Sequence, residues 1–117
     1  MAYSETFQRL ADAARAQVRG VPADEVDHLV AQGAVVLDIR DPDEHAAGHL
    51  EGSTNLSRGK LEMLVEGIIP DLGTTVLCYC NAVNRGALSA ASLQAMGYVN
   101  AAYIDGGLNA YRALSTT

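Results

Sequence analysis

The chain has 117 residues, of which 49% are hydrophobic and 19% are charged, a composition ordinary for one soluble globular domain. The formal net charge of −6 argues against nucleic-acid binding, which requires a basic surface. No apolar run approaches the roughly 20 residues of a membrane span, and no basic-then-apolar export signal opens the sequence, so we expect a cytoplasmic protein without membrane contact.

Hydrophobic spacing, proline and glycine predict helices that alternate with short strands along the chain. Apolar residues at helical spacing indicate the first helix, and a capping-box pattern at Asp41-Pro42-Asp43-Glu44 opens a short helix that Gly48 ends. In chain order, the expected elements are a helix over about 4–17, a helix over 22–32, a strand over 34–39, a helix over 41–47, an extended piece over 53–56, a helix over about 60–66, a strand over 74–79, a helix over about 86–96, a strand over 101–104 and a helix over 108–114.

This alternation predicts an α/β fold in which a parallel sheet carries helices on both faces. Functional residues of such sheets lie beyond the carboxyl ends of the strands. No linker or repeat interrupts the pattern, so we expect residues 1–117 to form a single domain.

Cys80 directly follows the apolar strand 74–79 and precedes the helix that begins near Gly86. The amino-terminal end of a helix presents unpaired N–H groups and a positive dipole end, both of which favour negative charge. A thiol at such a place tends to be a thiolate, which is the reactive form of cysteine. Cys80 is therefore a candidate nucleophile, and a buried, inert cysteine is the alternative.

The loop after Cys80 supplies donors for an anion. Successive amides can form a nest that stabilises a thiolate, a persulfide or an oxyanion, and Arg85 can complete it with its planar fork of donors. A solvent-facing arginine is the alternative. Arg58 and Lys60 form a small basic cluster that either is solvated surface or faces the mouth of the Cys80 site. The candidate substrate-binding residues are Asn81, Ala82, Val83, Asn84, Arg85, Gly86 and Arg58.

A metal site is not expected. Cys78 and Cys80 are separated by one residue, closer than zinc ligands usually stand, and the chain has no second cysteine pair. Cys78 is better explained as a small core residue of its strand. No serine stands in a Gly-x-Ser-x-Gly setting, so a hydrolase triad has no support and His49 is expected to be structural. Cysteines this close cannot form a long-loop disulfide, which suits a reducing cytosol.

Four stretches of the chain, in the same order, resemble the rhodanese (thiosulfate sulfurtransferase-like) family in its single-domain form. The match covers about residues 18–117 and leaves 1–17 as an N-terminal helical extension. The four stretches are Val36-Leu37-Asp38-Ile39-Arg40 with Glu44, Gly48-His49-Leu50-Glu51-Gly52-Ser53-Thr54-Asn55-Leu56, Leu77-Cys78-Tyr79-Cys80-Asn81-Ala82-Val83-Asn84-Arg85, and Asp105-Gly106-Gly107-Leu108-Asn109-Ala110-Tyr111. The resemblance implies a rhodanese-like fold whose parallel sheet has about five short strands.

The resemblance also implies a sulfurtransferase that needs no cofactor beyond a covalent persulfide on Cys80. The thiol would take the outer sulfur of a donor such as thiosulfate and pass it to a thiol or cyanide acceptor. The amides of 81–86 would cradle the persulfide, and Arg85 would attract the anionic donor. A sulfur-relay protein could also take part. The residues expected to give structural support are Asp38, Arg40, Glu44 and His49.

Two other functions stay open. A related architecture supports phosphatase and arsenate-reductase chemistry with a longer loop, whereas only four residues separate Cys80 from Arg85. A rhodanese-like module that only binds or regulates a partner typically lacks the cysteine. Ala82-Val83 stand where many relatives carry serine and glycine, and valine disfavours positive φ, so we expect a differently shaped loop. Nothing in the sequence indicates an oligomeric state.

Overall fold

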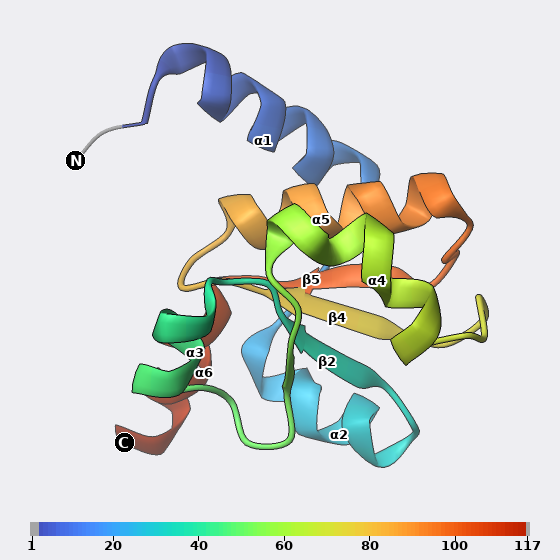
Figure 1. Cartoon of the computed structure of the whole chain (residues 1–117). Helices are drawn as coiled ribbons and strands as arrows, with labels where there is room; N and C mark the ends of the chain where they lie inside the picture. Colours follow the sequence, from blue (N-terminus) through green and yellow to red (C-terminus); the bar gives the residue numbers. More distant parts are fainter. Residues whose placement is uncertain (1–2, 117) are drawn as a thin grey trace.

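Five parallel strands form the central sheet of the computed structural model, which describes residues 3–116 (Figure 1). Their spatial order is β1-β5-β4-β2-β3, so β4 lies in the middle. Every neighbouring pair is parallel, so each strand is connected to the next by a crossover. The strands are β1 (Arg19–Val21), β2 (Val35–Asp38), β3 (Thr54–Asn55), β4 (Val76–Tyr79) and β5 (Ala101–Ile104).

The crossovers between the strands are helical. The helices are α1 (Glu5–Gln17), α2 (Val26–Ala31), α3 (Pro42–Ala47), α4 (Leu61–Ile68), α5 (Asn84–Met96) and α6 (Gly107–Ala113), with 3₁₀ turns at Ala23–Glu25, Arg58–Lys60 and Leu114–Thr116. None of the helices within residues 3–116 is long and apolar enough to cross a membrane.

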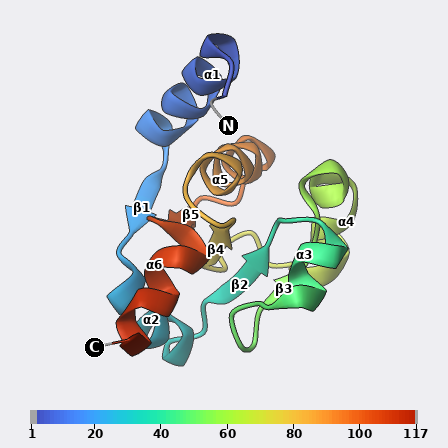
Figure 2. The ribbon, with the colours of Figure 1, turned by 90° about the vertical axis from the view of Figure 1, so that its left-hand side faces the viewer.

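Both faces of the sheet are buried, each by its own set of helices. In β4, Cys78 joins a core formed with α4 and α5, whereas Leu77 and Tyr79 join a core formed with α2 and α6. Figure 2 shows the resulting layers, with α5 on one side of the sheet and α2 and α6 on the other. A strand covered on both faces has no polar side, which explains why β4 reads as a continuous apolar run.

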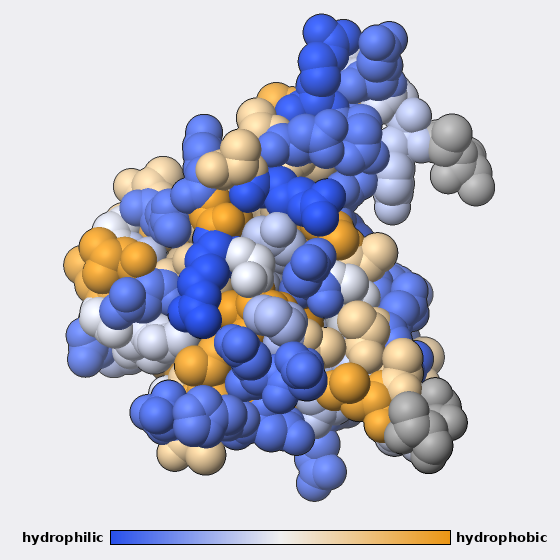
Figure 3. Space-filling view, turned by 180° about the vertical axis from the view of Figure 1, so that it is seen from behind, coloured by the Kyte–Doolittle hydropathy of each residue, from blue (hydrophilic) through white to orange (hydrophobic). Residues whose placement is uncertain are grey.

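The helix α1 forms an additional outer layer that packs on α5 (Figures 1 and 2). Its buried residues Ala11 and Ala14 are small, which allows the two helices to approach closely. The side-chain amides of Gln8 and Asn84 exchange hydrogen bonds of 3.2 and 3.4 Å, so α1 also holds the first residue of α5. Seen from behind, α1 overhangs the body of the molecule and its outer surface is mostly hydrophilic (Figure 3).

The predicted α/β fold is confirmed, with its parallel sheet, its helices on both faces and its N-terminal helix. The edge strand β1 falls in the gap between two predicted helices. It has only three residues, two of them exposed, so it lacks the apolar run by which a strand is recognised. The helix expected from Pro22 begins as a 3₁₀ turn and becomes α-helical at Val26, and α5 begins at Asn84 rather than near Gly86.

The chain leaves β2 and β4 in opposite directions. From β2 it continues to β3 at one edge of the sheet, and from β4 it continues to β5 on the other side. In doubly wound folds, ligands bind at the carboxyl ends of two strands related in this way. Cys80 follows β4 at this position and Arg40 lies just beyond the end of β2.

Candidate active site

Cys80 lies between the protein core and a cavity of about 340 Å³. Its side chain packs with the core on the α5 side of the sheet, and only 4% of the residue is exposed. A thiol at the wall of such a cavity can meet a small molecule while most of its surface is shielded from water. The residues that line the cavity are Tyr3, Arg15, Cys80, Asn81, Ala82, Val83, Asn84 and Arg85.

The second cysteine, Cys78, lies inside β4 and is fully buried. Burial raises the pKa of its thiol to about 12. A thiol with this pKa is protonated at neutral pH and offers no thiolate for attack. Of the two cysteines, Cys80 is therefore the one suited to be a nucleophile.

The loop between β4 and α5 reaches the helix without backbone strain. Val83, the residue before α5, has φ −129° and ψ −48°, and no non-glycine residue within 3–116 has a positive φ. The β-branched side chain at this position is therefore tolerated. Because α5 begins at Asn84, the amides of its first turn have no acceptor within the helix and are free to face an anion.

The start of α6 holds the loop from the opposite side. The N–H groups of Leu108 and Asn109 donate to the carbonyls of Cys80 and Asn81 at 2.9 and 3.1 Å. In a planar trans peptide, the N–H group points away from the carbonyl of the same unit. The carbonyls of Cys80 and Asn81 point toward α6, so the N–H groups of Asn81 and Ala82 point away from it. The α6 contacts thus orient the donors of the loop.

A buried ion pair anchors the other side of the site. Arg40 donates to both carboxylate oxygens of Asp38, at 2.9 Å through Nε and 2.7 Å through Nη2, and both residues are almost wholly buried. His45 contacts the same carboxylate at 2.8 Å. Burial alone would raise the pKa of Asp38, but the hydrogen bonds from Arg40 and His45 outweigh it and hold the pKa below its ordinary value.

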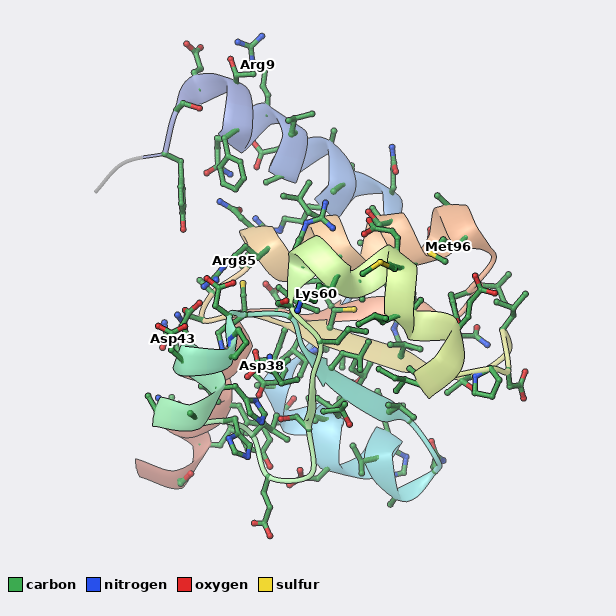
Figure 4. The ribbon with its side chains drawn as sticks, in the orientation of Figure 1. Arg9, Asp38, Asp43, Lys60, Arg85 and Met96 are labelled. Carbon is green, nitrogen blue, oxygen red and sulfur yellow. The ribbon has the colours of Figure 1, made fainter. Side chains whose placement is uncertain are left out.

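A chain of hydrogen bonds connects this ion pair to the loop. Arg40 donates to the side-chain carbonyl of Asn81 at 3.0 Å, and the Asn81 amide contacts Glu44 at 3.3 Å. Glu44 receives two hydrogen bonds from Arg85, at 2.8 and 3.0 Å. These bonds from Arg85 are the main reason why the pKa of Glu44 falls to about 2. Figure 4 shows Arg85 at the start of α5, on the side facing α3.

The structure brings together most of the candidate site residues. Cys80 and the five residues that follow it all line the cavity, and Asp38, Arg40 and Glu44 support the loop through the contacts described above. His49 supports His45, since its Nδ1 contacts the His45 carbonyl at 2.7 Å and the two rings stack at 3.7 Å.

Two candidate substrate-binding residues lie away from the cavity wall. Gly86 is buried behind the loop, where an added Cβ would lie 3.3 Å from the carbonyl oxygen of Cys78. Arg58 contacts Ser92 at 3.5 Å and Glu62 at 3.7 Å and does not line the cavity. The contacts of Arg58 therefore place it on the face of α4 and α5.

Three residues of the site were not among the candidates. Arg15 reaches the cavity from α1, and Tyr3 reaches it from the segment just before α1. His45 contacts Asp38 from α3. The position of α1 follows from its packing on α5, which no local pattern in the sequence encodes. His45 directly follows the capping box Asp41–Glu44, and that pattern indicated a residue close to the end of β2.

The described part of the chain, residues 3–116, contains no group of three or more His, Cys, Asp or Glu side chains arranged to hold a metal ion. The ionisable side chains near the loop are instead engaged with one another. Asp38 is paired with Arg40, and Glu44 is paired with Arg85. The chemistry that this arrangement offers is that of one thiol surrounded by hydrogen-bond donors.

Comparison with known proteins gives a consistent picture. A family model described as a rhodanese-like domain matches residues 22–114. The thiosulfate sulfurtransferase GlpE of Pseudomonas fluorescens (strain Pf0-1) is 35% identical over 96 residues, which are 82% of this chain and 86% of the relative. GlpE of Pseudomonas entomophila (strain L48) is 40% identical over 85 residues, 73% of this chain and 76% of the relative.

Solved structures extend the similarity to the N-terminal helix. The protein RPA3614 of Rhodopseudomonas palustris CGA009, described as a possible tyrosine phosphatase, has a TM-score of 0.84 and 27% identity, covering 98% of this chain and 95% of that chain. A thiosulfate sulfurtransferase from Pseudomonas aeruginosa has a TM-score of 0.81 and 26% identity, covering 95% of this chain and 22% of that chain. The family model starts after α1, whereas both structures cover more than the family core.

Proposed function

Because the chain belongs to the rhodanese-like domain family and is a sulfurtransferase, we propose that Cys80 carries the transferred sulfur as a persulfide. The observation that carries this proposal is the position of the Cys80 thiol on the cavity wall, directly before the amino-terminal end of α5. Cys78 is buried and protonated, so it is unsuited to the same task.

The first half of the reaction loads the sulfur. The Cys80 thiolate attacks the outer sulfur of thiosulfate, the donor that the names of the relatives indicate. A new S–S bond forms at Sγ, and the bond to the SO₃ group breaks with its electron pair leaving on sulfite. The loop amides and the helix dipole of α5 stabilise the resulting persulfide anion.

The second half of the reaction unloads the sulfur. A thiolate or cyanide attacks the terminal sulfur of the persulfide, and the S–S bond breaks with its electron pair returning to Sγ. The sulfur is carried by Cys80 alone, so the proposed cycle needs no metal or organic cofactor. A reducing compartment such as the cytoplasm would keep the resting thiol available.

Intact-mass measurement tests the proposal. We expect wild-type protein incubated with thiosulfate to gain the mass of one sulfur atom and to lose it again after addition of cyanide. Cys80→Ser should show no gain, whereas Cys78→Ala should behave as the wild type. An adduct that persists in Cys80→Ser, or the absence of any adduct with thiosulfate, mercaptopyruvate and a cysteine-desulfurase persulfide, would contradict the proposal.

The description of RPA3614 as a possible tyrosine phosphatase makes phosphate-ester hydrolysis the competing activity. Only four residues separate Cys80 from Arg85, so the loop offers few amides to a phosphoryl group, and Glu44 already compensates the charge of Arg85. We expect negligible hydrolysis of an aryl phosphate. Appreciable hydrolysis that disappears in Cys80→Ser would favour the phosphatase.

A further inference from the structure

We propose that Arg15, from the helix outside the family model, recognises the anionic group of a small sulfur donor and thereby completes the active site. This inference rests on the proposed function, because it assigns the donor-binding subsite of the same reaction. Arg15 would be a specificity-determining residue, and the donor class would be a small molecule with an oxyanion next to its transferable sulfur, of which thiosulfate is the simplest.

Arg85 is already engaged by a carboxylate of the protein. Two positively charged residues line the cavity, Arg85 and Arg15. Both terminal nitrogens of Arg85 donate to Glu44, in a paired geometry at 2.8 and 3.0 Å. This carboxylate compensates the charge of the guanidinium and takes one N–H of each terminal nitrogen, so Arg85 keeps three N–H donors but little net charge for a ligand. Arg85 is therefore a weak receptor for a doubly charged anion.

Arg15 has weaker partners than Arg85. Its Nε donates to the Tyr103 hydroxyl at 3.2 Å, a neutral partner, and its Nη2 lies 3.7 Å from Asp105. The side chains of Arg15 and Asp105 are 48% and 51% exposed, so this ion pair is solvent-screened and contributes little. Within residues 3–116, Nη1 of Arg15 makes no hydrogen bond. Arg15 thus keeps both charge and terminal donors for a ligand in the cavity.

The position of Arg15 is fixed from behind. Tyr103 belongs to β5 and is buried except for 5% of its surface, so its hydroxyl is a rigid acceptor. Gly20 in β1 provides the space for it, because a Cβ on Gly20 would lie 2.7 Å from that hydroxyl oxygen. The edge strand and β5 together therefore place a guanidinium at the cavity wall, and a guanidinium with one nitrogen held loses less freedom on binding.

The reaction makes a cation at this place useful. The net charge of −6 repels an anionic donor, and the attacking thiolate repels it as well. When the S–S bond of thiosulfate breaks, its electron pair moves to the sulfite group, on the side away from Cys80. A guanidinium from α1 can neutralise that group in the bound donor and in the leaving sulfite, while the α5 amides hold the transferred sulfur.

The test compares two substitutions on one helix. Arg15→Gln and Arg9→Gln each remove one positive charge from α1, but Arg9 points away from the body of the molecule (Figure 4) and does not line the cavity. We expect Arg15→Gln to lower kcat/KM for thiosulfate about tenfold or more, the value of one charge-assisted hydrogen bond, mainly through KM. Arg9→Gln should stay within twofold of the wild type.

Two further readouts separate donor recognition from a general loss of structure. The rate at which cyanide unloads preformed persulfide should be unchanged in Arg15→Gln, because that step no longer contains the donor. In calorimetry with the unreactive Cys80→Ser background, Arg15→Gln should weaken thiosulfate binding by a similar factor. Tyr103→Phe, which removes only the hydroxyl that positions Arg15, should raise KM for thiosulfate by a smaller factor and leave the cyanide step intact.

The outcomes distinguish this inference from the proposed function. Persulfide formation in the wild type with equal KM values for Arg15→Gln and Arg9→Gln would overturn the role of Arg15 and leave the Cys80 persulfide standing. Slower cyanide unloading in Arg15→Gln would also count against it. If the wild type formed no persulfide with any donor, the proposed function itself would fall.

Discussion

At the scale of single residues, Glu44 connects the two ends of the loop that follows Cys80. Its carboxylate accepts hydrogen bonds from Arg85, from the Asn81 amide and from the backbone N–H of Asp41 at 3.2 Å. One side chain thereby connects the cap of α3, the residue after Cys80 and the first turn of α5. The hydrogen bonds from Arg85, and after them the one from Asp41, favour the ionised form and lower the pKa of Glu44 to about 2.

We predict a pH-dependent stability difference between the wild type and Glu44→Gln. The folded-state pKa of about 2 lies below the ordinary value of 4.5, so the ionised carboxylate stabilises the fold above pH 4.5 and loses this effect as the pH falls toward 2. Glu44 is 29% exposed, and solvent screening reduces the gain, so we expect a difference of about 1–2 kcal/mol at neutral pH.

Urea unfolding at several pH values measures this difference. The gap in the free energy of unfolding between the two proteins should shrink between pH 5 and pH 2, while titrations elsewhere cancel in the comparison. A gap that stays constant with pH would show that Glu44 acts through packing and not through its charge.

The residues of the site differ in how far the sequence could predict them. Cys80, Asp38 and Arg40 directly follow or end buried strands, and strand ends are visible in the sequence as the limits of apolar runs. The pairing of Glu44 with Arg85 joins residues 41 positions apart, so it could be recognised only once the fold was known. The presence of Arg15 at the site could not be predicted from the sequence either, because it depends on how α1 packs on α5.

At the scale of elements, α6 acts as a clamp, because its first residues hold the loop between β4 and α5. It begins at Gly107 with φ +57°, a left-handed conformation that glycine adopts without penalty. A Cβ at this position would collide with the carbonyl oxygen of Cys80 and lie 2.6 Å from that of Ala82. The close approach of α6 to the loop therefore depends on the missing side chain.

We predict that Gly107→Ala destabilises the protein by about 3 kcal/mol or more and strongly reduces persulfide formation, because the loop carbonyls have to move. Gly52→Ala is the matched control, since Gly52 also has a positive φ of +85° but has no atom within 4 Å of an added Cβ. The free energy of unfolding of Gly52→Ala should fall by only about 1 kcal/mol, from backbone strain alone. Thermal unfolding and the mass assay for persulfide check both variants, and equal losses in the two would refute the clamp.

The elements themselves were predictable to different degrees. β5 matches its predicted range 101–104, and β2, β4 and α1 lie within about two residues of theirs, because apolar runs and helical spacing define them. β1 could not be predicted from the sequence, because an edge strand of three residues is specified by its pairing with β5 and not by its own residues. The 3₁₀ turn after Pro22 could not be distinguished from the start of a helix, because proline commonly precedes both.

At the scale of the whole molecule, α1 has to be part of the cooperative fold if it contributes to the site. Its only deeply buried residues are Ala11 and Ala14, and the neighbouring Ala13 is exposed. The interface with α5 therefore depends on small side chains and excludes charge.

We predict that Ala14→Asp lowers the free energy of unfolding by about 2–4 kcal/mol, because a carboxylate would be buried between two helices without a partner. Ala13→Asp places the same charge on the exposed face of α1 and should stay within about 0.5 kcal/mol of the wild type. Urea unfolding followed by far-UV circular dichroism should show one transition in every case. An unchanged midpoint for Ala14→Asp would mean that α1 is only loosely attached.

The hydrogen bonds from Leu108 and Asn109 to the loop carbonyls have a consequence for biosynthesis. In synthesis these two residues follow Cys80 by 28 and 29 positions. Until they emerge, the carbonyls beside the cysteine lack their partners and the surrounding peptide groups have no fixed orientation. We therefore predict that a nascent chain that ends before Leu108 does not yet hold the loop amides in the orientation that a persulfide on Cys80 would need.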